Sequence, residues 1–196
     1  RSLAYWKKNF NSLKSIFPDK LSNISALDFY KAANNVKPSL IRTNADELTY
    51  HLHVLIRFEI EKSLIEGSVS VKDLPSIWNE KYKEYLNIDV PSDSQGILQD
   101  IHWSHGSFGY FPTYTIGSFY AAQFYSQALK EIPNLESEVE NGNMINLLNW
   151  LRLKIHKHGK KYDAQDLCIK VTGKKLEFKY FMDYAKEKYS EIYSIK

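Results

Sequence analysis

GILQDIHWSHGSFGYFPTY, residues 96–114, is the stretch around which the rest of the chain is organised. It places two histidines, a carboxylate, an amide, two tyrosines and three glycines between stretches of ordinary amphipathic helix. Gly106 and Gly109 permit a positive φ or a close backbone approach, and Pro112 disfavours continuous helix. The pattern therefore predicts a helix end, a loop and then a new helix.

The polar side chains of this stretch have two interpretations. His105, Tyr110 and Tyr114 are able to point their polar tips into one cleft, where they would donate hydrogen bonds to a developing oxyanion. The alternative is aromatic core packing in which each polar tip has a partner. Both interpretations remain open at this point.

Helical periodicity dominates the sequence on either side. Apolar residues recur at spacings of three and four, and Ser, Asp, Asn, Gly and Pro stand at the expected helix ends. Leu48 to Leu64 is the longest such segment before the quoted stretch, with Gly67 at its expected C-terminal cap. We expect an all-α fold, a single helical region over residues 1–196, with roughly eight or nine helices and no sheet. The expected helices include residues 3–17, a short one after Ser25, 44–64, one that starts at Leu74 and is ended by Pro91, 115–130, a piece after Pro133, 144–158, one from Asp163 to Gly173, and a C-terminal helix.

Arg42 precedes one of these helices. Asn44 and Glu47 have capping-box spacing, and Asp46 adds negative charge to the expected first turn, so the helix should begin here. A guanidinium just before such a helix is placed to face a cleft and to hold a carboxylate with two parallel hydrogen bonds. An ordinary surface arginine is the alternative.

Composition restricts the class of protein. The hydrophobic fraction is 43%, the charged fraction is 25% and the net charge is +3, with acids and bases interspersed, so nucleic-acid binding is not expected. The basic cluster from Lys154 to Lys161 falls at a helix end, where cations favour the helix dipole. A single cysteine, Cys168, no apolar run of membrane-spanning length and no signal peptide predict a cytoplasmic protein without a membrane segment.

Metal and nucleophile motifs are missing from the sequence. His51 and His53 would point about 200° apart on a helix, and His102 and His105, although three apart, have no third ligand nearby. His-Glu-x-x-His and Gly-x-Ser-x-Gly are absent. We therefore expect no metal ligand within this chain.

Two segments carry a family resemblance: IRTNADELTY at residues 41–50 and GILQDIHW at residues 96–103. They resemble two signature motifs of the carboxypeptidase Taq family, whose members are helical zinc metallocarboxypeptidases. The likeness continues through VKDLPSIWN at residues 71–79, FGYFPTY at 108–114 and IHKHG at 155–159, and it covers essentially the whole chain in order.

The resemblance implies roles for individual residues. Arg42 would grip the terminal carboxylate of a peptide substrate. His105, Tyr110 and Tyr114 have the spacing of a His and two Tyr that steady the tetrahedral intermediate in related helical zinc peptidases. Asp46, Gln99, Asp100 and His102 would orient the groups that touch substrate or metal.

The absence of the family's His-Glu-x-x-His helix implies that the zinc ligands and the general-base glutamate lie before Arg1. The chain would then be the C-terminal portion of a helical zinc peptidase and inactive alone, with Zn²⁺ or Co²⁺ held by the N-terminal part of the same enzyme. Peptides are the expected substrates, and the intact protein is expected to form a homodimer. A non-catalytic helical domain that binds peptides or mediates dimerisation is the alternative.

Overall fold

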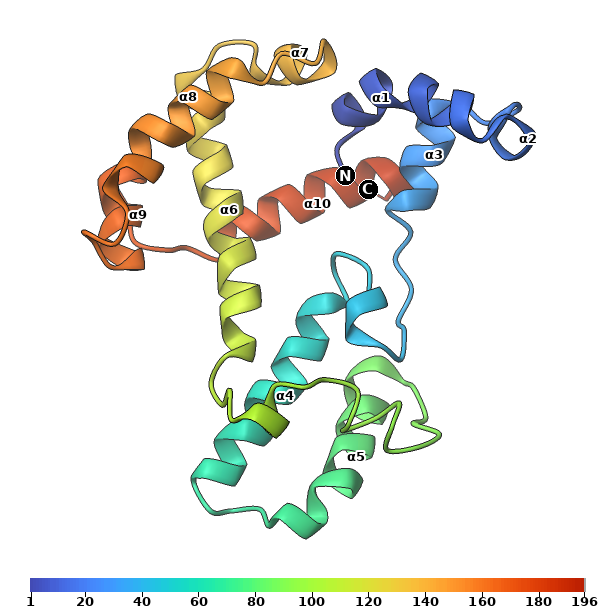
Figure 1. The fold of residues 1–196 in the computed structure, drawn as a ribbon, viewed down its shortest axis with the longest axis vertical. Coiled ribbons are helices and arrows are strands. Elements are labelled where there is room, and N and C mark those ends of the chain that lie inside the picture. Colours follow the sequence, from blue (N-terminus) through green and yellow to red (C-terminus); the bar gives the residue numbers. More distant parts are fainter. Residues whose placement is uncertain (196) are drawn as a thin grey trace. The chain divides into compact units, whose positions relative to one another are not determined.

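The computed structural model describes residues 1–195 of the protein. Over this range the chain forms ten α-helices and four short 3-10 helices, with no β-strand (Figure 1), so the all-α prediction is confirmed. The helices group into two compact units: unit 1 comprises Arg1–Asn34 and the chain from Ser118 onward, and unit 2 comprises Asn35–Gly117. The expectation of a single helical region over residues 1–196 stays a prediction.

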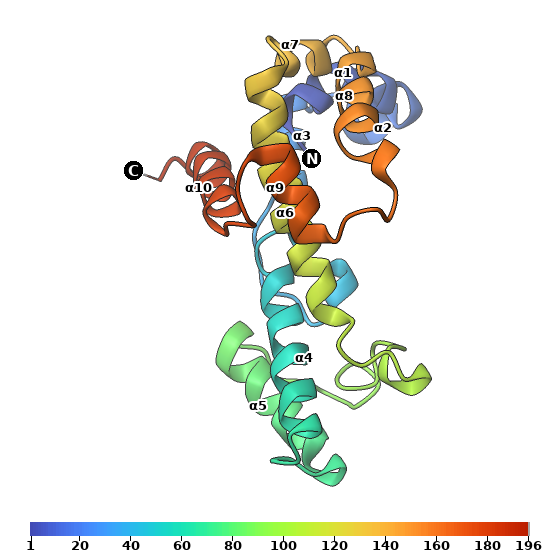
Figure 2. The ribbon, with the colours of Figure 1, turned by 90° about the vertical axis from the view of Figure 1, so that its left-hand side faces the viewer.

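Unit 2 is built around a pair of packed helices, α4 and α5 (Figure 2). Its fully buried core consists of apolar and aromatic side chains from these two helices, Ile56, Ile60, Leu74, Trp78, Tyr82 and Leu86. Burying such a face supplies most of the stability of an amphipathic helix pair. In chain order the elements are η1 (Arg42–Asn44), α4 (Tyr50–Ile65), η2 (Val71–Asp73), α5 (Leu74–Leu86), η3 (Trp103–His105) and the start of α6 (Phe111–Glu131).

The start of α4 was predicted wrongly. Asp46 does not sit in the first turn of the helix; its carboxylate accepts the backbone N–H groups of Leu48 and Thr49 at 2.8 and 2.9 Å, and the Thr49 hydroxyl at 2.6 Å. These bonds hold a turn, so the α-helix begins only at Tyr50. Local bonding by a short acidic side chain has replaced helical bonding here.

The other boundaries in unit 2 follow sequence signals more closely. Leu74 and Pro75 open α5 after Asp73, as predicted, because proline is tolerated in the first helical turn. Leu86 is the last residue of α5, and Asn87, in the left-handed region at φ 53°, is its C-cap. The helix therefore ends before Pro91, where its end was predicted. α6 begins at Phe111 rather than at Thr115, with Pro112 as its second residue.

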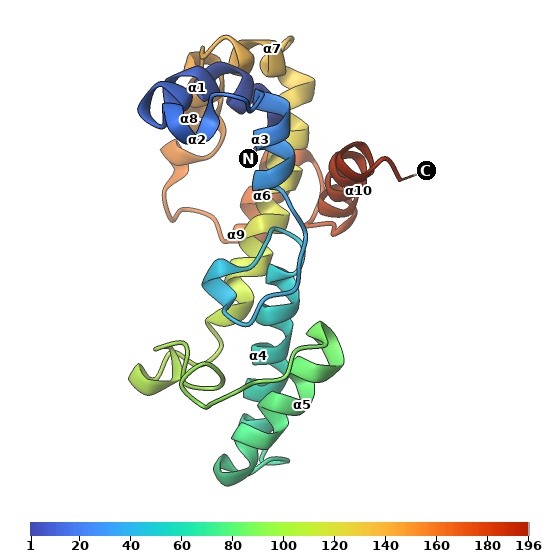
Figure 3. The same cartoon turned by 90° about the vertical axis from the view of Figure 1, so that its right-hand side faces the viewer.

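Unit 1 contains α1 (Leu3–Ile16), α2 (Pro18–Leu21), α3 (Ala26–Ala33), the rest of α6, α7 (Leu135–Glu140), α8 (Ile145–Lys154), η4 (His156–His158), α9 (Ala164–Thr172) and α10 (Lys179–Tyr193). α1 packs against α3, which is close to it in the sequence, and against α7, which lies far along the chain (Figure 3). A second buried core joins α6 to α9: Ala128, Ile132, Leu135, Val139, Trp150 and Val171.

Capping residues define several ends in unit 1. Ser25 is the N-cap of α3, as predicted, and it forms a capping box with Asp28 that was not predicted. Asp163 accepts the backbone N–H of Asp166 at the start of α9, as predicted. The single helix predicted over residues 144–158 is wrong, because α8 ends at Lys154 and a 3-10 turn follows. Within residues 1–195, no helix combines the length and apolar character needed to cross a bilayer.

Candidate functional site

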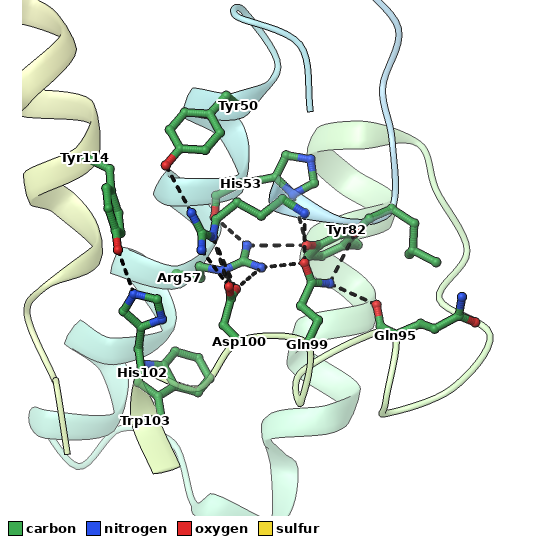
Figure 4. A network of polar contacts seen from close by, with 12 residues as sticks. Tyr50, His53, Arg57, Tyr82, Gln95, Gln99, Asp100, His102, Trp103 and Tyr114 are labelled. Carbon is green, nitrogen blue, oxygen red and sulfur yellow. Dashed lines mark hydrogen bonds and ion pairs between the residues drawn. The ribbon is translucent and has the colours of Figure 1, made fainter. Parts of the chain in front are cut away.

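The polar centre of unit 2 is a carboxylate held between two buried guanidinium groups (Figure 4). Arg57 Nε donates to Asp100 Oδ2 at 2.7 Å. Arg42 donates to Asp100 Oδ1 from Nη2 at 2.7 Å and from Nε at 3.1 Å. Arg57 is fully buried, and the side chains of Arg42 and Asp100 are only 8% and 10% exposed. The three residues therefore form a desolvated ion cluster that joins η1, α4 and the loop before η3.

Gln99 connects the same elements without charge. Its Oε1 accepts the backbone N–H of Arg42 and Nη2 of Arg57, both at 2.9 Å, and its Nε2 donates to the carbonyl oxygen of Leu40 at 3.2 Å. The predicted orienting residues Gln99 and Asp100 thus lie together beside Arg42.

Burial and charge oppose each other in this cluster. Burial by itself would raise the pKa of Asp100, but hydrogen bonds and charge from Arg42 and Arg57 outweigh it and hold that pKa below its ordinary value. Burial would likewise lower the pKa of Arg42, and Asp100 reverses this shift so that the pKa is raised. Both groups therefore stay charged, and the guanidinium carbons gain further stabilisation from aromatic faces, 4.5 Å from Trp78 for Arg57 and 5.1 Å from Tyr114 for Arg42.

Arg42 has a different geometry from the one predicted. The Nε and Nη2 edge, which would hold a substrate carboxylate with two parallel bonds, is already bonded to Asp100. Nη1 donates to the Tyr50 hydroxyl at 3.0 Å. Of the five N–H groups of a guanidinium, one on Nη1 and one on Nη2 lie outside these bonds. A carboxylate would therefore have to meet Arg42 through its terminal nitrogens and not through the Nε edge.

The predicted histidine and tyrosines lie next to one another. His102 packs on Phe111 with ring centroids 4.3 Å apart, and its Nε2 is 2.9 Å from the Tyr114 hydroxyl. His105 and Tyr110 have ring centroids 6.1 and 5.9 Å from His102. These five residues come from the N-cap of η3, η3 itself, the following loop and the first turn of α6.

Exposure distinguishes the two interpretations of this aromatic group. Tyr110 is 50% exposed and His105 is exposed, so neither is packed in a core. Tyr114 lies between His102 on one side and the Arg42 guanidinium on the other. Tyr110 also packs edge-on against Tyr114, with ring centroids 5.4 Å apart. Arg42, Tyr114, His102, His105 and Tyr110 therefore form one group of neighbours, in which Arg42 is buried and His105 and Tyr110 are exposed.

Three polar residues of α4 were missed by sequence reasoning. His53, Arg57 and Glu61 are 0%, 0% and 4% exposed, and their spacing of four residues places them on one face of the helix. That spacing within a strongly apolar helix was the available signal. Burial and the nearby arginines lower the pKa of His53 to about 4, which keeps the imidazole neutral; its Nδ1 lies 3.0 Å from the Tyr82 hydroxyl.

Metal binding finds no support in the described side chains. Among residues 1–195, no group of three or more His, Cys, Asp or Glu side chains is arranged to hold a metal ion. His102 and His105 are neighbours, but His102 is committed to Tyr114 and no carboxylate completes a site. The side chains of residues 1–195 therefore do not fit a zinc site by themselves.

Known carboxypeptidases are similar to this chain along nearly its whole length. The chain is 44% identical over 193 residues to carboxypeptidase 1 of Bacillus subtilis (strain 168) and 42% identical to thermostable carboxypeptidase 1 of Thermus thermophilus. Each alignment covers 98% of this chain but only 38% of the relative. The crystal structure of the M32 carboxypeptidase from Deinococcus radiodurans R1 superposes with a TM-score of 0.95 and 38% identity, over 99% of this chain and 39% of that one.

The family itself follows from a match along nearly the whole sequence. The profile of the carboxypeptidase Taq (M32) metallopeptidases matches residues 1–189, which include both units and every residue of the candidate site. The chain therefore belongs to the carboxypeptidase Taq (M32) metallopeptidase family.

Proposed function

We propose that this chain supplies the substrate-binding side of a metallocarboxypeptidase site, which removes the C-terminal residue of peptides. The proposal is supported mainly by the group of neighbours that the buried Arg42 forms with Tyr114 and His102 and that includes the exposed His105 and Tyr110. A guanidinium close to several hydrogen-bond donors suits a peptide end, which presents a carboxylate and, one residue away, a scissile carbonyl.

In this proposal Arg42 meets the substrate carboxylate end-on, through its remaining N–H groups on Nη1 and Nη2. Asp100 and Arg57 fix the guanidinium plane, which lowers the entropy that binding must remove. His105, Tyr110 and Tyr114 donate to the carbonyl oxygen as negative charge develops on it. Burial lowers the pKa of His102, so the neutral imidazole keeps its bond to the Tyr114 hydroxyl near neutral pH.

The remaining parts of the enzyme come from outside these residues in our proposal. A zinc or cobalt ion, its ligands and the general base belong to the N-terminal part of the same enzyme, and the assembled protein is a cytoplasmic homodimer. The 38% coverage of the bacterial relatives leaves room for such a part. The 196-residue chain alone is accordingly expected to show no peptide hydrolysis.

The test compares Arg42→Lys with the parent in the metal-loaded, full-length enzyme. Losing the planar fork but keeping the charge should lower kcat/KM on peptides with a free C-terminal carboxylate by about tenfold to a hundredfold. Amidated peptides, which lack that carboxylate, should lose less than about threefold. Arg152→Lys, an exposed arginine on α8, is the matched control and should leave both substrates unaffected.

Two outcomes would contradict the proposal. Equal losses on free and amidated peptides would mean that Arg42 only stabilises unit 2. Peptide binding without hydrolysis in the metal-loaded, full-length protein would favour the alternative, a non-catalytic peptide-binding domain.

A further inference from the structure

Glu61 is a buried carboxylate that lies outside the ion cluster. It sits on α4, one turn beyond Arg57, and is 4% exposed. Its Oε1 accepts the indole N–H of Trp103 at 2.7 Å, and its Oε2 accepts the backbone N–H of Gly109 at 3.2 Å. One side chain thus bonds to two points of the following loop, and each oxygen has a donor.

These two bonds bracket the loop that carries the exposed end of the candidate site. Trp103 opens η3, Gly109 immediately precedes Tyr110, and His105 lies between the two anchored residues. Most of the intervening residues are exposed, so little burial holds them. Inside the loop, the backbone N–H of Ser107 donates to the carbonyl oxygen of His102 at 2.9 Å, and the Ser107 hydroxyl lies 3.0 Å from His105 Nδ1. The loop is internally bonded but reaches α4 through Glu61.

Simple packing does not account for a carboxylate at this position. A buried negative charge is expensive unless it is fully bonded, and no Lys, Arg or His of residues 1–195 forms an ion pair with Glu61. The indole and backbone donors take the place of a cation. An uncharged side chain of similar size would fill the same space, but it would present at most one acceptor oxygen to the two donors.

We propose that Glu61 is a positioning residue, which fixes the loop of His105 and Tyr110 on α4 and so sets their distance from Tyr114. This inference deepens the proposed function and rests on it. Glu61 does not touch substrate in this role. Its removal should change how well the donors are placed, and therefore the rate of the chemical step more than the affinity for substrate.

The first test measures the anchor itself, by amide and indole hydrogen exchange in the 196-residue chain. In Glu61→Gln, an N–H donor must face either Trp103 or Gly109, so at least one of these two protons should exchange at least about tenfold faster. Amides of α4 and α5 should keep their parent rates. Glu59→Gln is the matched control, because Glu59 lies on the same helix and bonds Lys81 and Tyr85 but not the loop.

The second test measures catalysis in the metal-loaded, full-length enzyme. Glu61→Gln should lower kcat by about tenfold to a hundredfold and change KM by less than about threefold, while Glu59→Gln leaves both near the parent values. Trp103→Phe removes the indole donor together with part of the ring, leaves the Gly109 bond to Glu61 in place, and should give a smaller loss of kcat. Trp103→Phe replaces Glu61→Gln in this test if Glu61→Gln does not fold.

The two measurements separate the possible failures. Faster exchange throughout α4 and α5, or unchanged exchange at Trp103 and Gly109, would overturn the anchoring role whatever the enzyme does. A loosened loop with an unchanged kcat in an active enzyme would overturn the positioning role and leave the proposed function standing. A parent enzyme that hydrolyses no peptide would refute the proposed function, and with it the positioning role, whereas the exchange data would still decide the anchor.

Discussion

Asp100→Asn tests the ion cluster of unit 2 most directly. Asp100 is the carboxylate shared by Arg42 and Arg57, both of which are almost completely buried. Asparagine has nearly the same shape, keeps one acceptor oxygen and places an N–H₂ group where the second oxygen was. The change therefore removes one negative charge from between two positive ones and adds a donor that faces donors.

The size of the effect follows from burial. Leaving a buried charge without its partner destabilises proteins by about 3–5 kcal/mol, and the oxygen that asparagine retains places our expectation near the lower limit, about 3 kcal/mol. With a urea slope of about 2 kcal/mol/M for a chain of this size, the midpoint should fall by about 1.5 M at pH 7. Asp93→Asn, an exposed acid in the same loop, should shift it by less than about 0.3 M.

The pH dependence of this difference provides an internal check. The pKa of Asp100 is lowered in the folded state, so its contribution is fully present above the unfolded value of about 3.9 and is lost as the pH falls through the lower folded value. The gap between the two proteins should be constant from pH 7 to 5 and should close below about pH 4. Tryptophan fluorescence is a suitable probe, because Trp78 and Trp103 lie in unit 2. A midpoint within about 0.3 M of the parent at pH 7 would refute the reasoning.

Two further predictions concern a buried imidazole and two glycines. Because the pKa of His53 is about 4 in the folded protein and about 6.5 unfolded, the unfolded chain takes up a proton first as the pH falls, and stability is lost between these values. His53→Gln should remove about 2 kcal/mol of the loss between pH 7 and 5 in urea unfolding, and an unchanged pH dependence would contradict a buried neutral imidazole. A methyl group at Gly96 would lie 2.7 Å from Val90 Cγ1, whereas one at Gly117, within α6, has nothing within 4 Å. Thermal unfolding should therefore show Gly96→Ala destabilising by about 2 kcal/mol and Gly117→Ala stabilising by about 0.5–1 kcal/mol, and the opposite order would contradict the packing described for the loop.

Local signals in the sequence predicted much of the fold. The apolar spacing of α1, the capping box at Ser25, the proline in the first turn of α5 and the cap at Asp163 all depend on residues within a turn of one another. The start of α4 was mispredicted because Asp46 has two local bonding options, a helical first turn and a turn closed by its own carboxylate. The energies of such options differ little, and tertiary context decides between them.

The candidate site depended on distant residues, and here the sequence was less informative. It indicated that Arg42 and the stretch from Gln99 to Tyr114 matter, and these residues are neighbours in the structure. It did not indicate that Asp100 binds Arg42. The two residues are 58 positions apart, and the sequence alone does not distinguish Asp100 from the other acidic residues as a partner for Arg42. Nor did it indicate Arg57 or Glu61, because polar residues on an amphipathic helix are ordinarily assigned to the solvent face.

The division of the chain has a consequence for its synthesis. Unit 2 is one uninterrupted segment, whereas unit 1 joins the first 34 residues to a segment that begins at Ser118. A ribosome adds about 5–20 residues per second, so α1 waits roughly 5–20 s after it emerges before its partner α7 has been translated. The part of α1 that packs against α3 is covered soon after synthesis, whereas the part that packs against α7 stays exposed during that interval. The inserted unit, by contrast, has all its contacts available as soon as its own last residue leaves the exit tunnel.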